Sequence, residues 1–181
     1  MKWLIASDLH GSVDCCKRLM EAYEREGAQR LLLLGDLLSG GVLGTGKKKV
    51  ADMLNEKKAV ITCVRGNCDS ESDMAMLEFP MREVDVVPIP EIKGRMVFAT
   101  HGHRYNGGHL PPNMRRGDIL LHGHTHTPMT ERRTDFLCFN PGSVAQPRGG
   151  SERGYMTLDN GVFRWVTLDG EEYRAYELEQ L

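Results

Sequence analysis

The sequence predicts an α/β (α+β) fold in which two β-sheets pack together and helices cover their outer faces. In the first half, short apolar runs alternate with segments of helical periodicity, and in the second half short strand-like segments are separated by turn signals. Several of the apolar runs end directly in polar residues that bind metals in proteins. Because the chain has 181 residues, we expect a single domain over residues 1–181.

The first half predicts parallel strands joined by helices. Residues 13–26 carry Leu19, Met20 and Tyr23 at helical spacing, and Ser12 or Gly11 near the start is a candidate cap. Strand–helix–strand order implies right-handed parallel units, in which functional groups gather beyond the carboxyl ends of the strands. The predicted strands cover residues 3–6, 31–34 and 59–64, and a second helix is predicted over residues 47–57.

After about residue 83 the pattern changes to short strands with turns between them. Lys93-Gly94 and Asn160-Gly161 are turn signals, and the second pair predicts a hairpin. We therefore expect the second half to be mostly antiparallel. Its predicted strands cover residues 84–92, 95–100, 119–121, 137–140, 155–158 and 163–168.

Composition excludes several classes of protein. The formal net charge of −2 argues against broad nucleic-acid binding. No apolar run approaches the roughly 20 residues that span a membrane. The apolar stretch at residues 3–6 is too short for a signal-peptide core, so we expect a cytoplasmic location. The five cysteines match no zinc-binding spacing and are expected to be reduced thiols; they are Cys15, Cys16, Cys63, Cys68 and Cys138.

Polar residues follow each strand of the first half. Asp8 and His10 are two residues apart, and on an extended strand end they face the same way, so both can reach one ion. The carboxylate of Asp36, after Gly35, can bridge two metals, and the amide of Asn67 is a neutral oxygen ligand. Each residue alone also has a structural interpretation, as a cap or a turn residue.

Histidines follow the strands of the second half. Five of the chain's seven histidines fall in two short clusters, each at the end of a predicted buried strand. Imidazole is the commonest nitrogen ligand of metals, and two such clusters are difficult to explain by packing alone. The clusters contain His101 and His103, then His122, His124 and His126.

The order of these elements is more specific than any one of them. The chain reads Asp-x-His, Gly-Asp, Gly-Asn-x-Asp, His-Gly-His and Gly-His-x-His, followed by Asn140-Pro141-Gly142-Ser143. In this order and spacing it resembles the calcineurin-like metallophosphoesterase superfamily, and within it the small YfcE-type phosphodiesterases of bacteria and archaea. The resemblance covers nearly the whole chain and implies a four-layer αββα sandwich, two mixed β-sheets flanked by helices.

The resemblance also implies a ligand set and a group of catalytic residues. Asp36 would bridge two ions, and His122 would bind neither. Catalytic roles fall to Asp36 and Asn67 in the metal site and, less directly, to Cys68 and His103. The first ion would be held by Asp8, His10 and His126, and the second by Asn67, His101 and His124.

These residue types suit hydrolysis of a phosphodiester. Two cations roughly 3.5–4 Å apart can share a bridging water and lower its pKa, so that hydroxide attacks phosphorus in line. No phospho-enzyme is then expected. Oxygen and nitrogen ligands suit manganese, iron, zinc or nickel, and the resemblance favours manganese. A phosphomonoesterase would use the same ligands, and a non-catalytic scaffold like the retromer subunit of this fold should have lost them.

Cys68 departs from the wider superfamily, which has histidine after the asparagine of this motif to protonate the leaving group. The YfcE-type branch also has cysteine there. The general acid therefore stays open between the Cys68 thiol and His103, and Cys68 also has an interpretation as a packed residue. Arg65 is a candidate contact for a substrate phosphate, whereas Arg148 is expected to be solvated.

Two further expectations concern surroundings and partners. A loop over residues 39–46 contains four glycines and is expected to be mobile beside the metals. The expected partner is a small phosphoester substrate, without membrane or broad nucleic-acid binding, and a homo-oligomer is left open.

Overall fold

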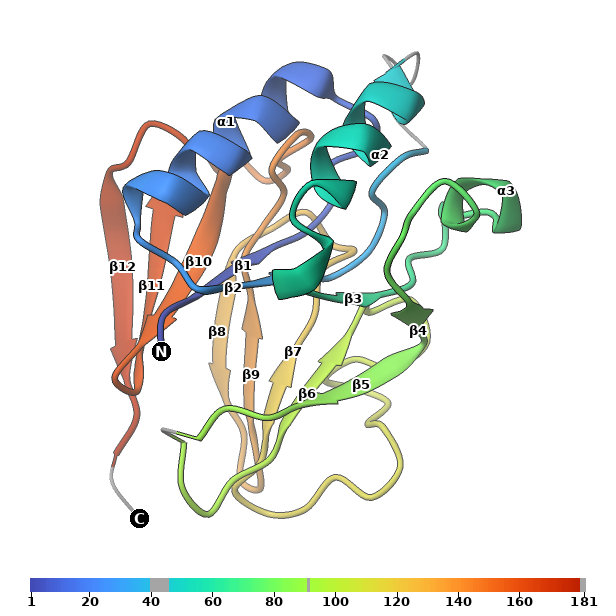
Figure 1. The fold of residues 1–181 in the computed structure, drawn as a ribbon. Coiled ribbons are helices and arrows are strands. Elements are labelled where there is room, and N and C mark those ends of the chain that lie inside the picture. The colour runs from blue at the N-terminus through green and yellow to red at the C-terminus, as the bar shows by residue number, and fades with distance from the viewer. Residues whose placement is uncertain (40–45, 91, 180–181) are drawn as a thin grey trace.

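Two β-sheets packed face to face form the body of the molecule (Figure 1). The computed structural model describes residues 1–39, 46–90 and 92–179. Most of the predicted loop over residues 39–46 therefore lies outside the described residues. Within the described ranges, no helix has the length and hydropathy of a membrane span.

The first sheet is mixed. Its centre is parallel, because β1 pairs with β2 and β2 pairs with β3 in the same direction. β10, near the end of the chain, pairs antiparallel with the other side of β1 and begins the predicted hairpin with β11. The strand order is β12 (Glu172–Glu177), β11 (Val162–Thr167), β10 (Gly154–Asp159), β1 (Trp3–Ala6), β2 (Arg30–Leu33), β3 (Ile61–Val64) and β4 (Met81–Arg82).

The second sheet is also mixed, and its three central strands β6, β7 and β9 run parallel. The expectation of a mostly antiparallel second half is wrong for this sheet. Long connections follow β6 and β7, so the chain can cross over before each parallel partner, whereas an antiparallel pair needs only a hairpin. The order is β5 (Val84–Val87), β6 (Val97–Thr100), β7 (Ile119–Leu121), β9 (Leu137–Asn140) and β8 (Met129–Arg132).

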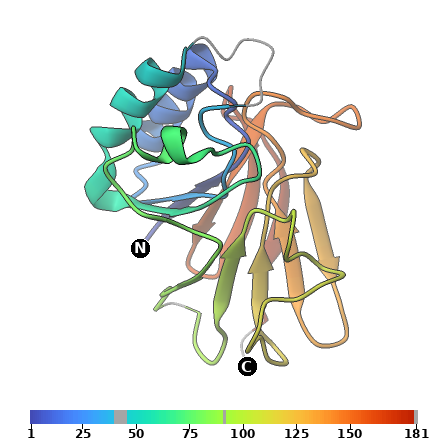
Figure 2. The ribbon, with the colours of Figure 1, turned by 90° about the vertical axis from the view of Figure 1, so that its right-hand side faces the viewer.

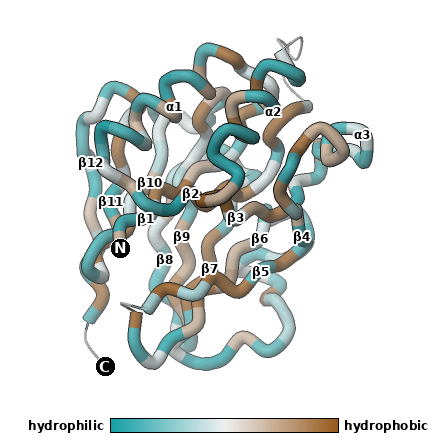
Figure 3. The backbone as a smooth tube through the Cα atoms, viewed as in Figure 1, coloured by the Kyte–Doolittle hydropathy of each residue, from teal (hydrophilic) through white to brown (hydrophobic). Residues whose placement is uncertain are grey.

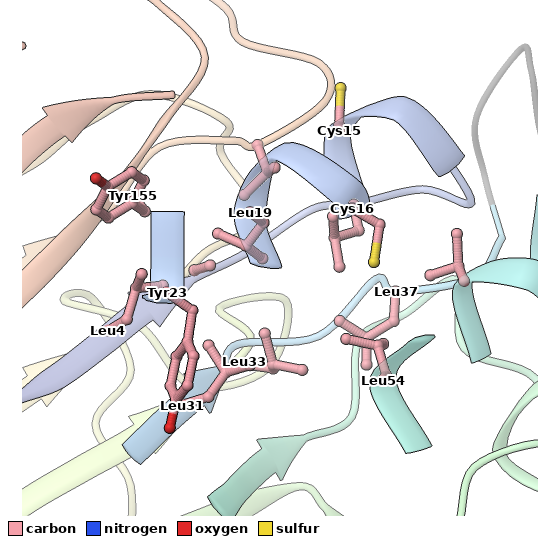
Figure 4. Close-up of a cluster of buried hydrophobic side chains, with 14 of the residues drawn as sticks. Leu4, Cys15, Cys16, Leu19, Tyr23, Leu31, Leu33, Leu37, Leu54 and Tyr155 are labelled. Carbon is pink, nitrogen blue, oxygen red and sulfur yellow. The ribbon is translucent and has the colours of Figure 1, made fainter. Parts of the chain in front are cut away.

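Helices α1 (Val13–Arg25) and α2 (Lys47–Asn55) cover the outer face of the first sheet (Figure 1). The Ser12 side chain caps α1 by accepting from the Cys15 amide, as predicted. The apolar face of α1 packs on β2 through Leu19, Leu31 and Leu33 (Figure 4). The other helical segments are short: the 3₁₀-helix η2 (Lys58–Val60) and α3 (Glu71–Met74).

A second apolar cluster fills the space between the sheets. Leu32 of the first sheet, Leu121 and Phe139 of the second, and Trp165 of β11 are members of it. Figure 3 shows the same arrangement as hydrophobic colour along the strands, with hydrophilic colour on much of the surrounding helices and loops. Side chains on both faces of the central strands are therefore buried, which explains why those strands read as continuous apolar runs.

The outer face of the second sheet is covered by the loop that follows β6, at residues 101–118 (Figure 2). Leu110 and Met114 of this loop pack near Phe98 and Cys138 of the sheet. Pro111-Pro112 and nearby glycines disfavour a helix there. The two mixed sheets of the predicted sandwich are confirmed, but in the described part of the chain its helices lie on one side and a loop forms the fourth layer.

Candidate metal centre

Strand ends from both sheets converge at one end of the sandwich. Residues that follow β1, β2 and β3 of the first sheet meet residues that follow β6 and β7 of the second, because the carboxyl ends of these parallel strands point to a shared edge. Nε2 of His101 lies 3.4 Å from Oδ2 of Asp36, and Nε2 of His126 lies 3.2 Å from Oδ1 of Asp8. Side chains more than 100 residues apart in sequence thus share one site.

One group of ligand atoms comes from Asp8, His10 and His126. Nε2 of His10 lies 3.7 Å from Oδ1 of Asp8 and 3.3 Å from Nε2 of His126. Oδ1 of Asp8 is buried and has no hydrogen-bond partner among the described residues. An ionised carboxylate oxygen without a donor is costly to bury, so this atom fits a bound cation.

A second group comes from Asp8, Asp36 and His101. Asn67 adds its amide oxygen 3.1 Å from Nε2 of His101. The ring of His124 lies 5.0 Å from that of His101, although His124 belongs to no three-residue group of this kind among the described residues. Asp36 also belongs to a group with His10 and Cys68, so its carboxylate lies between the two halves of the site.

The histidine rings are oriented by backbone carbonyls. Nδ1 lies 2.7 Å from the Ser39 oxygen in His10, 2.7 Å from the Leu34 oxygen in His101 and 2.6 Å from the Gln146 oxygen in His126. A carbonyl only accepts, so each Nδ1 carries the proton, and in the neutral ring each Nε2 turns a lone pair into the site. There the lone pairs lie opposite carboxylate oxygens and opposite one another. A bound cation would remove the resulting repulsion.

Backbone conformation points to the same residues. Of the seven non-glycine residues with positive φ in the described chain, five are predicted ligands. Such conformations cost free energy and tend to persist where function requires them. The five are Asp8 (φ 60°), His10 (φ 47°), Asp36 (φ 53°), His124 (φ 66°) and His126 (φ 60°).

Comparison with known proteins identifies the family. The profile of the calcineurin-like phosphoesterase superfamily domain matches residues 1–161. The chain belongs to this superfamily. Phosphodiesterase YfcE from Escherichia coli K12 is 39% identical over 182 residues, covering 97% of this chain and 96% of YfcE. A phosphodiesterase from Methanocaldococcus jannaschii is 28% identical and covers 99% of this chain and 100% of its own length.

Solved structures agree. The structure of the E. coli phosphoesterase YfcE superimposes with a TM-score of 0.91 at 38% identity, covering 99% of this chain and 100% of that one. Vacuolar protein sorting 29 from Cryptosporidium parvum superimposes with a TM-score of 0.67 at 18% identity, covering 99% of this chain and 98% of that one, which shows the shared fold alone. The superfamily uses divalent metals, and this chain contains residue groups that could hold them.

Within the candidate centre, Asp36 is held in place by close backbone contacts. Its Oδ1 accepts from the Cys68 amide at 2.8 Å. A Cβ on Gly66 would lie 2.0 Å from that same oxygen, so the glycine is required for the two loops to approach. Burial opposes ionisation of Asp36, but when the His101 ring carries a second proton, its hydrogen bond and charge lower the pKa of Asp36 to about 2. The carboxylate is therefore ionised and ready to bind a cation.

Asp69 joins the loops that carry Asp36 and Asn67, and the sequence interpretation assigned it no role. Its side chain, in a residue only 1% exposed, accepts from the amides of Asp36 (2.8 Å), Leu37 (2.9 Å) and Gly66 (2.8 Å). The signal for it is the last position of the Gly-Asn-x-Asp motif. A buried carboxylate with three backbone donors fixes the relative position of both loops.

Cys68 and His103 lie close to the metal-ligand groups. Burial, and then the charge of Asp36, raises the pKa of the Cys68 thiol to about 12. The ring of His103 lies 5.5 Å from that of His101, and its Nε2 is 3.9 Å from Oε2 of Glu83. Burial lowers the pKa of His103, and the charge of His101 adds to this. Nδ1 of His103 is buried without a partner in the described structure.

The other residues singled out in the sequence are arranged as follows. Nδ1 of His122 lies 3.0 Å from the Gly123 oxygen, and this buried ring belongs to none of the candidate groups among the described residues. Arg65 donates from Nε to the Asp69 carbonyl and does not line the site. A hollow of about 460 Å³ opens over the centre and is lined by His10, Asp36, Asn67, Cys68, His124, Thr125, His126, Gln146 and Arg148. Of these, sequence reasoning gave no role to Thr125 and Gln146, and it expected Arg148 to be solvated.

Proposed function

We propose that the chain is a metal-dependent phosphodiesterase that hydrolyses small phosphodiesters with two divalent ions bound at this centre. The observation that carries the proposal is the inward-facing set of ligand atoms, with three imidazole nitrogens whose ring partners leave them free for cations. The likeness to phosphodiesterase YfcE over nearly the full length supports the same activity.

The proposed assignment of the first ion follows the group of Asp8, His10 and His126, and that of the second ion rests on the neighbours of His101. We also propose that residues 1–181 act as one domain. Asp36 would contact both ions, because its Oδ2 lies 3.9 Å from Nε2 of His10 on one side and 3.4 Å from Nε2 of His101 on the other. Asn67 contributes a neutral oxygen, which limits the negative charge of the set. The first ion is assigned to Asp8, His10 and His126, and the second to Asn67, His101 and His124.

When bound, the ions would supply Lewis acidity toward phosphoryl oxygens and would lower the pKa of water toward neutrality. The residues of this chain hold the ligands in position and surround the hollow above them. Backbone carbonyls fix the three histidine rings, and Asp69 fixes the loops of Asp36 and Asn67. The hollow above them holds the ester groups of a small substrate.

Manganese is the proposed metal, because the family resemblance favours it among the ions that suit oxygen and nitrogen ligands. The raised pKa of Cys68 keeps its sulfur protonated and removes a thiolate that would favour softer ions. We also propose a cytoplasmic location, which is supported by the five cysteines, all of them free thiols in the structure.

Manganese-loaded protein is expected to cleave an aryl phosphodiester faster than the corresponding aryl monoester. A chelator should abolish hydrolysis and added manganese should restore it, because no side chain replaces the Lewis acidity of the ions. Initial rates on both substrates, with and without chelator, test this. If the protein hydrolyses no phosphoester with manganese, iron, zinc or nickel, this result would favour a non-catalytic scaffold instead.

The Cys68 side chain is expected to contribute little as a general acid, because a thiol with a pKa of about 12 gives up its proton poorly. Wild-type rates should therefore fall as the leaving-group pKa rises, and Cys68→Ser should change aryl diester hydrolysis little. Cys68→His should help poor leaving groups most, by up to about 10²-fold where the ring fits. Rates against leaving-group pKa for the three proteins measure this.

Two outcomes would change this assignment. Wild-type rates that are insensitive to leaving-group pKa would mean that another residue donates the proton, and His103→Ala would test the first candidate. A large loss of aryl diester hydrolysis in Cys68→Ser would show that the thiol itself takes part.

A further inference from the structure

Arg148 lies at the rim of the hollow over the metal centre. It is the only lysine or arginine among the described residues that line this hollow. Its side chain is exposed, which at first suggests a solvated surface group. Two features point instead to a binding role: its backbone is anchored to predicted ligands, and its guanidinium has no charge partner among the described residues.

The segment that carries Arg148 is anchored to predicted ligands. The Arg148 amide donates to the His126 carbonyl at 3.0 Å, and the His126 ring donates to the Gln146 carbonyl at 2.6 Å. Earlier in the same segment, the Ala145 amide donates to the Asp8 carbonyl at 3.2 Å. The base of the Arg148 side chain is therefore fixed relative to the centre, while its guanidinium remains free to turn over the hollow.

The guanidinium of Arg148 has no hydrogen-bond or ion-pair partner within the described ranges, in contrast to other cations near the site. Lys47 pairs with Asp73 at 2.9 Å, and Arg65 donates to the Asp69 carbonyl. An unpaired positive charge thus faces the space where an ester would bind.

We propose that Arg148 binds the phosphoryl group in the hollow and favours dianionic phosphoryl groups over monoanionic ones. This deepens the proposed function and rests on it. A guanidinium matches phosphoryl oxygens with paired N–H donors. A diester has two non-bridging oxygens that share one charge, whereas the monoester product has three oxygens and up to two charges. Arg148 therefore holds the product more strongly than the substrate and sets the degree of product inhibition.

The test measures binding without hydrolysis. Phenylphosphonate, a dianion, and its methyl ester, a monoanion, are titrated by calorimetry into manganese-loaded wild type, Arg148→Ala and Arg148→Lys. Arg148→Ala should weaken phenylphosphonate binding roughly 10-fold and the methyl ester by a smaller factor, because a charge-assisted hydrogen bond is lost. Arg148→Lys should retain most of the affinity for the dianion.

Arg132→Ala is the matched control. Arg132 is also exposed but pairs with Glu179 at the far end of the second sheet, so its loss should leave both affinities unchanged. Equal binding of phenylphosphonate by wild type and Arg148→Ala would overturn the inference, as would a loss explained by lower manganese content. Arg148-dependent binding in a protein that cleaves no diester would support the phosphoryl site and refute the proposed function.

Discussion

An Asp36→Asn variant is expected to lose about 10²-fold or more of phosphodiester hydrolysis and to bind both ions more weakly. Its carboxylate lies 3.4 Å from the Nε2 atom of His101 and 3.9 Å from that of His10. Asparagine has the same shape but lacks the charge and replaces one oxygen by a donor. Because even residues behind metal ligands contribute about 10–100-fold, a bridging ligand should contribute at least that much. Diester hydrolysis rates and manganese titrations measure both effects.

Asp85→Asn is the control, since Asp85 lies on strand β5 and pairs with Arg82 outside the hollow. It should keep wild-type activity and metal content. Full activity in Asp36→Asn would show that Asp36 does not bridge. Weakened binding of a single ion would assign Asp36 to one half of the centre only.

Asp69→Ala is expected to lower the free energy of unfolding by about 3 kcal/mol or more and to weaken metal binding by about 10–100-fold. The substitution leaves the buried amides of Asp36, Leu37 and Gly66 without their acceptor. It also removes the connection that holds the loop of Asp36 against that of Asn67. Urea denaturation of metal-free protein and manganese titration of folded protein separate the two effects.

The comparison for Asp69 is Asp118→Ala. Asp118 is also a buried carboxylate that accepts from two backbone amides, of Met96 and Arg115, away from the metal centre. This variant should be destabilised but should keep its metal affinity. If Asp69→Ala loses only stability, like Asp118→Ala, then Asp69 is a structural residue without influence on the ions.

Local sequence patterns predicted the positions of helices and strands more completely than they predicted which strands pair. The helix over residues 13–26 was confirmed within one residue because its apolar spacing and its cap are local signals. The parallel centre of the second sheet was not predicted, because the direction in which strands pair depends on long connections, one of which contains the unpredicted strand β8. Strand β12 was also missed, since its exposed residues lack an apolar run.

In the site, too, local sequence signals were easier to interpret than contacts between distant segments. The proposed ligands stand directly after apolar strands, so sequence spacing alone identifies them as candidates. The structure places them together. Arg148 has no such local signal, and the signal for Asp69 is only its place in the Gly-Asn-x-Asp motif. Their roles depend on which amides or charges lie opposite them, and these come from segments far away along the chain. The residues beside Arg148 in the sequence are of the kinds found beside solvated surface residues, so the sequence favoured a solvated side chain.

The most direct test of the two-ion centre is a titration of metal-free protein with manganese, following bound ions per chain and aryl diester hydrolysis in the same samples. The proposed centre predicts little activity with one ion bound, a rise as the second ion binds, and saturation at two ions per chain. Full activity with a single ion bound per chain would contradict it.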